Sequence, residues 1–227
     1  MRIDIWSDVV CPWCWIGKRR LQRAIALLGD DAPTIDIHWY PFLLDPDADA
    51  TPVPLREAYA RKFGGAERTA QLLAQTQATA RAEGLPFNFD RGQVRVTTLP
   101  AHRLLALAAR EGDPDAVGEA LFHAHFAQGR NLADTEVLVE AGAAGGLDAA
   151  RVRALLAGDE GEAEVRAQIA QAQAMGIRAV PTFVFDGRLA VQGAQPPEQL
   201  AATLRQALAA AAPASAAGAA CGPDGCA

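Results

Sequence analysis

The sequence predicts an α/β fold in which a β-α-β unit and a β-β-α unit are separated by an all-helical insertion. Three observations support this prediction. Short runs of alternating apolar and polar residues lie near both ends, helical periodicity adjoins them, and the middle is rich in alanine, leucine and glutamate with helix caps at intervals. The chain has 227 residues, 50% of them hydrophobic, so it can bury one substantial core or two modest ones.

The β-α-β unit is expected within residues 1–50. Residues 2–6 (RIDIW) alternate and predict a short strand, and residues 35–42, an alternating run with a proline near its end, predict a second one. Between them a helical pattern runs from Pro12 to Gly29, and glycine commonly ends a helix.

Residues 51–176 are expected to form the helical insertion. Helix starts are indicated at Thr51-Pro52, Asp113-Pro114 and Asp134, and a helix end at Gly64-Gly65. The spacing of apolar residues between such caps predicts about six helices.

The β-β-α unit is expected within residues 177–211. Residues 182–185 and 189–192 flank the turn Asp186-Gly187 and predict a hairpin, and Pro197 begins a last helix that reaches Ala211. The complete order is the thioredoxin arrangement, with a helical domain inserted between its two halves.

Composition and charge exclude several classes of function. The chain has 21 Lys and Arg against 27 Asp and Glu, a net charge of −6, and it has no basic block, so nucleic acid is not an expected partner. Asp4 and Asp8 fall where a secretory signal needs an apolar run, and no stretch reaches about 18 consecutive apolar residues. We therefore expect a soluble cytoplasmic protein without a membrane partner, as a monomer or homodimer.

Two of the four cysteines, Cys11 and Cys14, form a C-x-x-C pair where the first helix is expected to begin. A thiol attacks a disulfide only as the thiolate, and free cysteine, with a pKa of about 8.5, is mostly protonated near neutrality. At a helix N-terminus, unpaired N–H groups and the helix dipole favour the anion on Cys11, and Pro12 suits the first turn. Cys14, one turn further, is expected to be less accessible and to resolve the mixed disulfide.

A proline at the start of the predicted hairpin is the second element of the candidate site. Pro181 at a strand start can be a simple edge device. In a thioredoxin arrangement it would instead be cis and would present the backbone of Val180 to an extended substrate. Trp13, expected to stay partly exposed, and Pro12 are the other candidate substrate contacts.

Four separated segments carry a resemblance to a known family: SDVVCPWCWIGKRRL, TLPAHRLLALAAREG, EALFHAHFAQGRNLAD and GIRAVPTFVFDGRLAVQGAQPPEQL. Together they resemble the DsbA-family oxidoreductases of the FrnE-like subgroup, from about residue 2 to about residue 208. The resemblance implies a dithiol-disulfide active site that oxidises, reduces or isomerises disulfides of protein or peptide substrates. It implies no bound cofactor, with glutathione considered as a co-substrate. Cys11 resembles the family's nucleophile, Cys14 its resolving thiol and Pro181 its cis-proline.

The sequence departs from the wider thioredoxin pattern at one position. Thioredoxin-like proteins often carry a buried acid six residues before the nucleophile, and this position holds Ile5. Asp4 or Asp8 could take the role, so the base for Cys14 stays unassigned. Since no basic residue separates the two cysteines, Lys18 is the nearest candidate to support the Cys11 thiolate through its charge.

The last segment, residues 212–227, is expected to be a flexible tail with a second pair, Cys221 and Cys226. The turn-forming Gly-Pro and Asp-Gly between these cysteines would let their sulfurs meet, so a second redox pair that relays electrons to the first is one hypothesis. A zinc site of all four thiolates and a disordered end with incidental thiols are the competing interpretations. Among these interpretations of Cys221 and Cys226, the zinc site is not the preferred one, and no metal ligands are assigned.

The four histidines and two alternative functions complete the sequence-based expectations. His123 and His125 lie two residues apart on an expected helix and point to different faces, so packing is favoured over metal binding, and His38 and His102 are assigned structural roles. A glutathione-dependent isomerase of an aromatic or polyketide-type substrate is an alternative function on the same fold, in which serine replaces the first cysteine. A chaperone-like binding protein is the non-enzymatic alternative.

Overall fold

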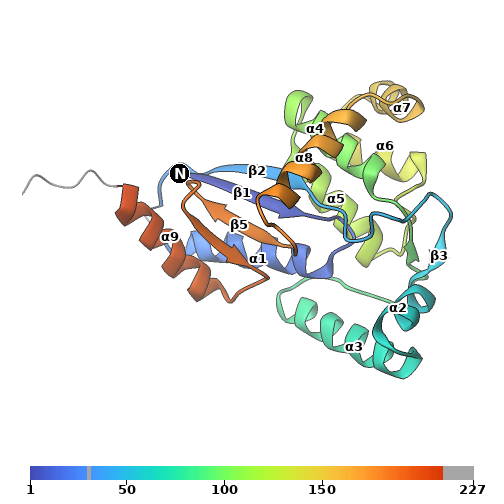
Figure 1. Cartoon of the computed structure of the whole chain (residues 1–227), viewed down its shortest axis with the longest axis horizontal. Helices are drawn as coiled ribbons and strands as arrows, with labels where there is room; N and C mark the ends of the chain where they lie inside the picture. The colour runs from blue at the N-terminus through green and yellow to red at the C-terminus, as the bar shows by residue number, and fades with distance from the viewer. Residues whose placement is uncertain (30–31, 212–227) are drawn as a thin grey trace, which may run out of the picture.

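The structure of the protein is a computed structural model, and it describes residues 1–29 and 32–211. Its central sheet joins strands from both ends of the chain (Figure 1). The strand order is β2 (Asp36–Pro41), β1 (Arg2–Ser7), β5 (Thr182–Phe185) and β6 (Leu189–Gln192). β1 is parallel to β2 and antiparallel to β5, and β5 pairs with β6 as a hairpin. The predicted thioredoxin arrangement of β-α-β and β-β-α units is confirmed.

One face of this sheet packs against two helices, α1 (Pro12–Ala26) and α9 (Pro197–Ala211), which also contact each other. Successive side chains of a strand point to opposite faces, so Ile3 and Ile5 of β1 lie together under these helices, where both are buried. Trp6 points to the other face, where it contacts the end of α8 (Glu162–Ala174).

The middle of the chain is predominantly helical, as predicted, but its details differ from the expectation. Residues 51–176 hold seven helices rather than about six, because short glycine-containing turns divide the later ones: α2 (Leu55–Phe63), α3 (Ala66–Ala82), α4 (Leu99–Glu111), α5 (Pro114–Phe126), α6 (Thr135–Ala144), α7 (Ala149–Ala157) and α8. A two-stranded ribbon of β3 (Val53–Pro54) and β4 (Val94–Arg95) was not predicted, because strands of two residues carry no periodic pattern.

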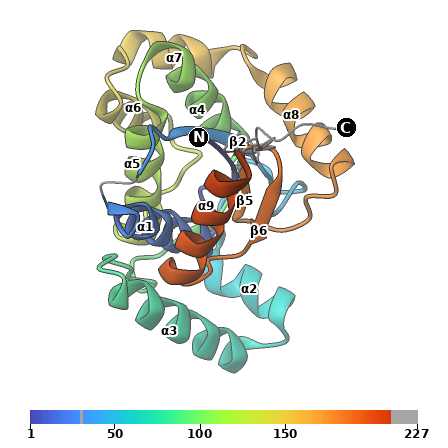
Figure 2. The same ribbon diagram turned by 90° about the vertical axis from the view of Figure 1, so that its left-hand side faces the viewer.

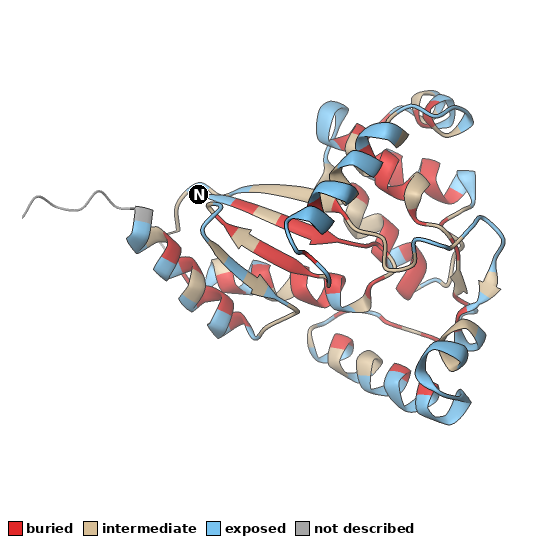
Figure 3. Cartoon of the chain, viewed as in Figure 1, coloured by how far each residue is buried: buried red, intermediate tan, exposed pale blue. Residues whose placement is uncertain are grey.

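An aromatic cluster joins the thiol-bearing helix α1 to this helical segment. Trp15 of α1 stacks on Phe87, Phe122 and Phe126, and the rings of Phe87 and Phe126 are stacked with centroids 4.6 Å apart. Figure 2 shows α2 and α3 on one side of α1, and α4 to α7 on the other. The first turns of α1 are therefore packed on several sides, and Figure 3 shows that they are mostly buried.

The predicted boundaries of the helical insertion, residues 51 and 176, stay a prediction.

No helix within the described part of the chain has the length and apolar character that a membrane crossing requires.

Candidate active site

The two cysteines lie where β1 ends and α1 begins. The backbone N–H of Cys11 donates to the carbonyl oxygen of Asp8 at 2.9 Å and closes the connecting turn. Cys11 has extended dihedrals, φ −89° and ψ 112°, and is the N-cap of α1, with Pro12 at the first helical position. The helix thus begins at the cysteines, as predicted. Cys11 is 4% exposed and Cys14 is 1% exposed, so the nucleophile candidate is the more accessible of the two.

The second half of the chain contributes the predicted proline loop. The peptide bond between Val180 and Pro181 is cis. The Cys11 thiol donates to the carbonyl oxygen of Val180, with the sulfur and oxygen 3.7 Å apart, although 169 positions separate the two residues in sequence. Trp13 is 39% exposed, so its predicted partial exposure is confirmed, and its contact with substrate stays a prediction. The structure therefore brings together the sequence-predicted site residues that it describes.

Cys14 lies deeper and interacts directly with Cys11, and both thiols are free. Burial raises the pKa of Cys14 well above its usual value, and the neighbouring Cys11 adds to the rise. The Ser7 hydroxyl and the backbone of Asp8 act on the Cys14 pKa in the opposite direction. Cys14 is therefore a protonated thiol near neutral pH, so it must lose a proton before it can attack.

Asp8, in the turn before Cys11, carries a buried carboxylate that is a candidate proton acceptor for Cys14. Its side chain is 1% exposed, and one oxygen, Oδ2, accepts a hydrogen bond from the backbone of Leu44 at 2.8 Å. The other oxygen, Oδ1, has no hydrogen-bond partner and lies 3.4 Å from Nε2 of His102. Asp4 instead pairs with Arg2 along β1. Of the two aspartates raised by the sequence, Asp8 is the fully buried one, and its Oδ1 has no hydrogen-bond partner.

Lys18 does not play the part considered for it. Its ammonium group pairs with Glu119 at 2.6 Å and Asp115 at 3.0 Å, both on α5. Burial alone would raise the pKa of Glu119, but hydrogen bonds from Lys18 and Trp15 outweigh it and lower that pKa. The expectation that Lys18 supports the Cys11 thiolate is therefore wrong, because α5 holds its charge in place.

The histidines differ more in environment than the sequence suggested. His38 is partly exposed and pairs with Asp36, whereas His102 lies beside Asp8, a proximity that no local sequence pattern indicates. His125 is buried, and neither of its ring nitrogens has a hydrogen-bond partner. Burial lowers the pKa of His125 to about 4, so its ring is neutral. No group of three or more potential metal ligands occurs among residues 1–29 and 32–211, and Cys221 and Cys226 lie outside them.

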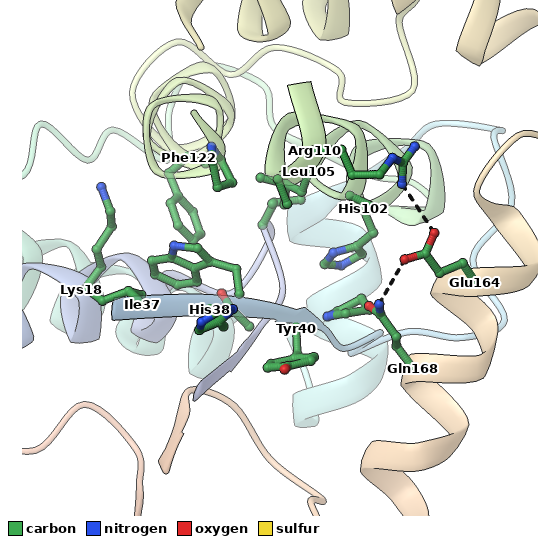
Figure 4. Close-up of a pocket in the computed structure, with 18 of the residues that line it drawn as sticks. Lys18, Ile37, His38, Tyr40, His102, Leu105, Arg110, Phe122, Glu164 and Gln168 are labelled. Atoms are coloured by element: carbon green, nitrogen blue, oxygen red, sulfur yellow. Dashed lines mark hydrogen bonds and ion pairs between the residues drawn. The ribbon is translucent and has the colours of Figure 1, made fainter. Parts of the chain in front are cut away.

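A cavity of about 370 Å³ lies between β2 and helices α4, α5 and α8 (Figure 4). Ser7 and His102, the neighbours of Cys14 and Asp8, form part of its wall. Figure 4 shows Arg110, Glu164 and Gln168 linked in a row near the edge of the view.

Close packing between α1 and the proline loop sets the position of Cys11. A Cβ atom on Gly17 would lie 2.9 Å from Cγ of Pro181 and 3.1 Å from Cζ of Phe183. We expect Gly17→Ala to lower the free energy of unfolding by about 1–2 kcal/mol, because overpacking outweighs the gain in helix propensity.

Gly118→Ala in α5 is the matched control, since its new Cβ would meet only Cδ2 of Leu105 at 3.8 Å. That substitution should stabilise the protein by roughly 0.5–1 kcal/mol. Urea denaturation of both variants measures the difference, and equal effects would contradict the close approach at Gly17.

Comparisons with known proteins agree with this geometry. The family model for the DSBA-like thioredoxin domain matches residues 2–205. A crystal structure described as a probable DsbA oxidoreductase from Streptomyces coelicolor superposes with a TM-score of 0.88 at 38% identity, covering 100% of this chain and 98% of that one. The uncharacterized protein YwbO of Bacillus subtilis is 28% identical over 204 residues, 86% of this chain and 90% of YwbO.

The cytosolic disulfide reductase DsbM of Pseudomonas aeruginosa shares the fold at 23% identity and a TM-score of 0.63, with 93% of this chain and 100% of DsbM covered. Assignment to the FrnE-like subgroup stays a prediction.

Proposed function

Because the chain belongs to the DSBA-like thioredoxin domain family, a family of thiol-disulfide oxidoreductases, we propose that it exchanges disulfides of protein or peptide substrates through Cys11 and Cys14. The observation that carries this proposal is the contact between the Cys11 thiol and the Val180 carbonyl beside cis-Pro181. This contact supports a mechanism in which the more accessible thiol reacts with an extended substrate that pairs with the Val180 backbone.

The proposed cycle has two steps. The Cys11 thiolate attacks one sulfur of a substrate disulfide, forms a mixed disulfide, and releases the other substrate sulfur as a thiolate. Cys14 then loses its proton and attacks Cys11, which forms the Cys11–Cys14 disulfide and releases the second substrate thiol. The reverse sequence oxidises a substrate dithiol to a disulfide and returns both cysteines to thiols.

The start of α1 supports the thiolate in the first step. The first turn of α1 contains no acidic residue, and backbone N–H groups at a helix start carry partial positive charge. This stabilisation acts on Cys11, at the N-cap, more than on the buried Cys14.

Several finer assignments belong to this proposal. Trp13 and Pro12 would contact the substrate chain, and glutathione is a candidate co-substrate. The presence of both thiols weighs against the glutathione-dependent isomerase alternative, which uses serine in place of the first cysteine. The chaperone-like alternative predicts suppression of client aggregation that survives loss of the thiols.

Reduction of insulin disulfides by a dithiol tests the proposal. The wild-type protein should accelerate precipitation of the insulin B chain well above the uncatalysed rate, and it should also oxidise a dithiol peptide when supplied in the disulfide form. Failure in both directions would remove disulfide exchange as the function.

The pair Cys221 and Cys226 could relay electrons to the first pair, as the sequence suggests. Replacing both by serine should then slow turnover with a large protein substrate while reaction of Cys11 with a small thiol reagent continues. Unchanged turnover would exclude the tail from the mechanism.

A further inference from the structure

A second cavity lies next to the turn that carries Cys11, and it shares no lining residue with the cavity described above. It has a volume of about 430 Å³ and lies between the active-site turn, helix α2 and the β3–β4 ribbon. We call it the α2 pocket. Its apolar wall consists mainly of Val10, Leu44, Val53, Leu55, Val94 and Val96. A cavity of this size is large enough for a small organic group or one to two amino-acid side chains.

The inner wall of the α2 pocket carries an unsatisfied polar group. His125 lines the pocket and is 1% exposed, and neither ring nitrogen makes a hydrogen bond. The backbone of Arg130 lies close enough to raise the pKa of His125 slightly against the effect of burial. It does not form a hydrogen bond of normal geometry with either ring nitrogen. A buried polar group without a partner costs about 1–3 kcal/mol, so a ligand atom that pairs with His125 would recover free energy on binding.

The wall of the α2 pocket includes the chain neighbour of Cys11. Val10, which precedes Cys11, forms part of its wall, and so does Tyr59, which packs against the cluster that contains both cysteines. Burial raises the pKa of Tyr59, and the negative charges of Cys11 and Asp8 raise it further, so its phenol stays protonated. A group attached to a sulfur bound at Cys11 could therefore extend past Tyr59 into the pocket.

Of the cations in the pocket lining, Lys62 is the one with no ion pair among residues 1–29 and 32–211, so it can pair with an anionic occupant. Three cations, Arg61, Lys62 and Arg95, and one carboxylate, Asp45, belong to its lining. Arg95 is neutralised by Asp45, and Arg61 pairs with Glu57 of the same helix on the exposed surface. Lys62 lies over the ring of Phe63, with the ammonium 5.9 Å from the ring centroid.

Resting on the proposed disulfide exchange, we propose that the α2 pocket is a substrate-specificity subsite for an apolar group that carries a carboxylate, attached to the sulfur that reacts with Cys11. The apolar body would contact the valine and leucine wall, the carboxylate would lie near Lys62, and a polar atom would pair with His125. The group could belong to a small acidic disulfide or to a peptide with an apolar and an acidic residue beside its cysteine.

The reaction at this subsite follows the same two steps. Cys11 attacks the disulfide and binds the half that occupies the pocket, while the other half leaves as a thiolate. Cys14 then displaces the bound half as a second thiolate. One substrate disulfide is reduced to two thiols and the dithiol is oxidised, so no further reactant is required.

Single-turnover oxidation of the reduced full-length protein tests the proposal with two matched aromatic disulfides. Dithiobis(nitrobenzoate) carries carboxylates and dithiodipyridine is neutral. The measured quantity is the rate constant for the acidic probe divided by the rate constant for the neutral one. Ala58→Trp should fill the pocket from α2 and lower this ratio about tenfold, the factor that 1.4 kcal/mol of lost binding gives. Lys62→Gln should lower it about threefold at low salt and less at high salt.

Arg56→Gln is the matched control, because it removes a positive charge from α2 outside the pocket lining. A second pair of probes, disulfide-linked peptides with Leu-Glu or Leu-Lys beside the cysteine, distinguishes the two sources of the acidic group. Selectivity in the aromatic pair alone assigns a small acid, and selectivity in the peptide pair assigns a polypeptide.

A ratio that does not respond to Ala58→Trp or Lys62→Gln in either pair of probes would overturn the subsite. Loss of reaction with every probe in the wild-type protein would instead contradict the proposed function itself, so the two failures are distinguishable.

Discussion

Cys11→Ser is expected to reduce disulfide exchange to the uncatalysed background, a loss of at least about 10³-fold, since removal of an enzymatic nucleophile acts on this scale. Cys11 is the thiol that contacts the Val180 carbonyl and occupies the N-cap of α1. A serine hydroxyl has no comparable anion near neutral pH and cannot form a disulfide. Insulin reduction and dithiol oxidation, measured with the same preparations, give the rates.

Cys14→Ser is the matched control for this prediction. It keeps the attacking thiol but removes the resolving one, so a mixed disulfide between Cys11 and the substrate should accumulate and be visible by mass spectrometry. Retained turnover in Cys11→Ser, or a mixed disulfide located on Cys14 in the wild type, would reverse the assigned roles.

Asp8→Asn is expected to slow the second step about 10²-fold, the lower end of what general acid-base groups contribute. Asp8 lies in the turn before Cys11 with Oδ1 unpartnered, and the Asn carbonyl oxygen can still accept the hydrogen bond from the Leu44 backbone. Stopped-flow measurement of substrate-thiol release from the preformed mixed disulfide isolates this step. Thermal denaturation of the variant shows whether its fold is retained.

Asp4→Asn is the control, because Asp4 lies on β1, the strand that leads to Asp8, but pairs with Arg2. Burial raises the pKa of Cys14, so its thiolate fraction, and with it the rate of the second step, should increase as pH rises toward that pKa. Asp8→Asn should lower the rate of the second step most at pH values below the Cys14 pKa, where removal of the Cys14 proton limits its attack. Equal effects of the two variants would exclude Asp8 as the proton acceptor.

The parts of the site that the sequence predicted correctly have local causes. The start of α1 at Pro12 follows from a proline in the first turn, and the β5–β6 hairpin follows from alternation around Asp186-Gly187. The cis bond before Pro181 was expected from the arrangement of the whole fold around the dithiol.

The parts that the sequence could not predict depend on residues far apart in the chain. The partner of Lys18, Glu119, is 101 positions away, so no local pattern indicated that its charge is held by α5. His102 reaches Asp8 only because α4 packs against the loop after β2, where its ring also lies 3.0 Å from the Phe42 carbonyl oxygen.

Equilibration of the full-length protein in glutathione buffers of graded redox potential tests the central claim most directly. Rapid alkylation followed by peptide mapping reports the state of each cysteine. We predict a reversible, two-electron transition in which a Cys11–Cys14 disulfide forms and disappears with buffer potential, also when Cys221 and Cys226 are replaced by serine. Alkylation of both Cys11 and Cys14 at every potential, with no disulfide between them, would contradict the account.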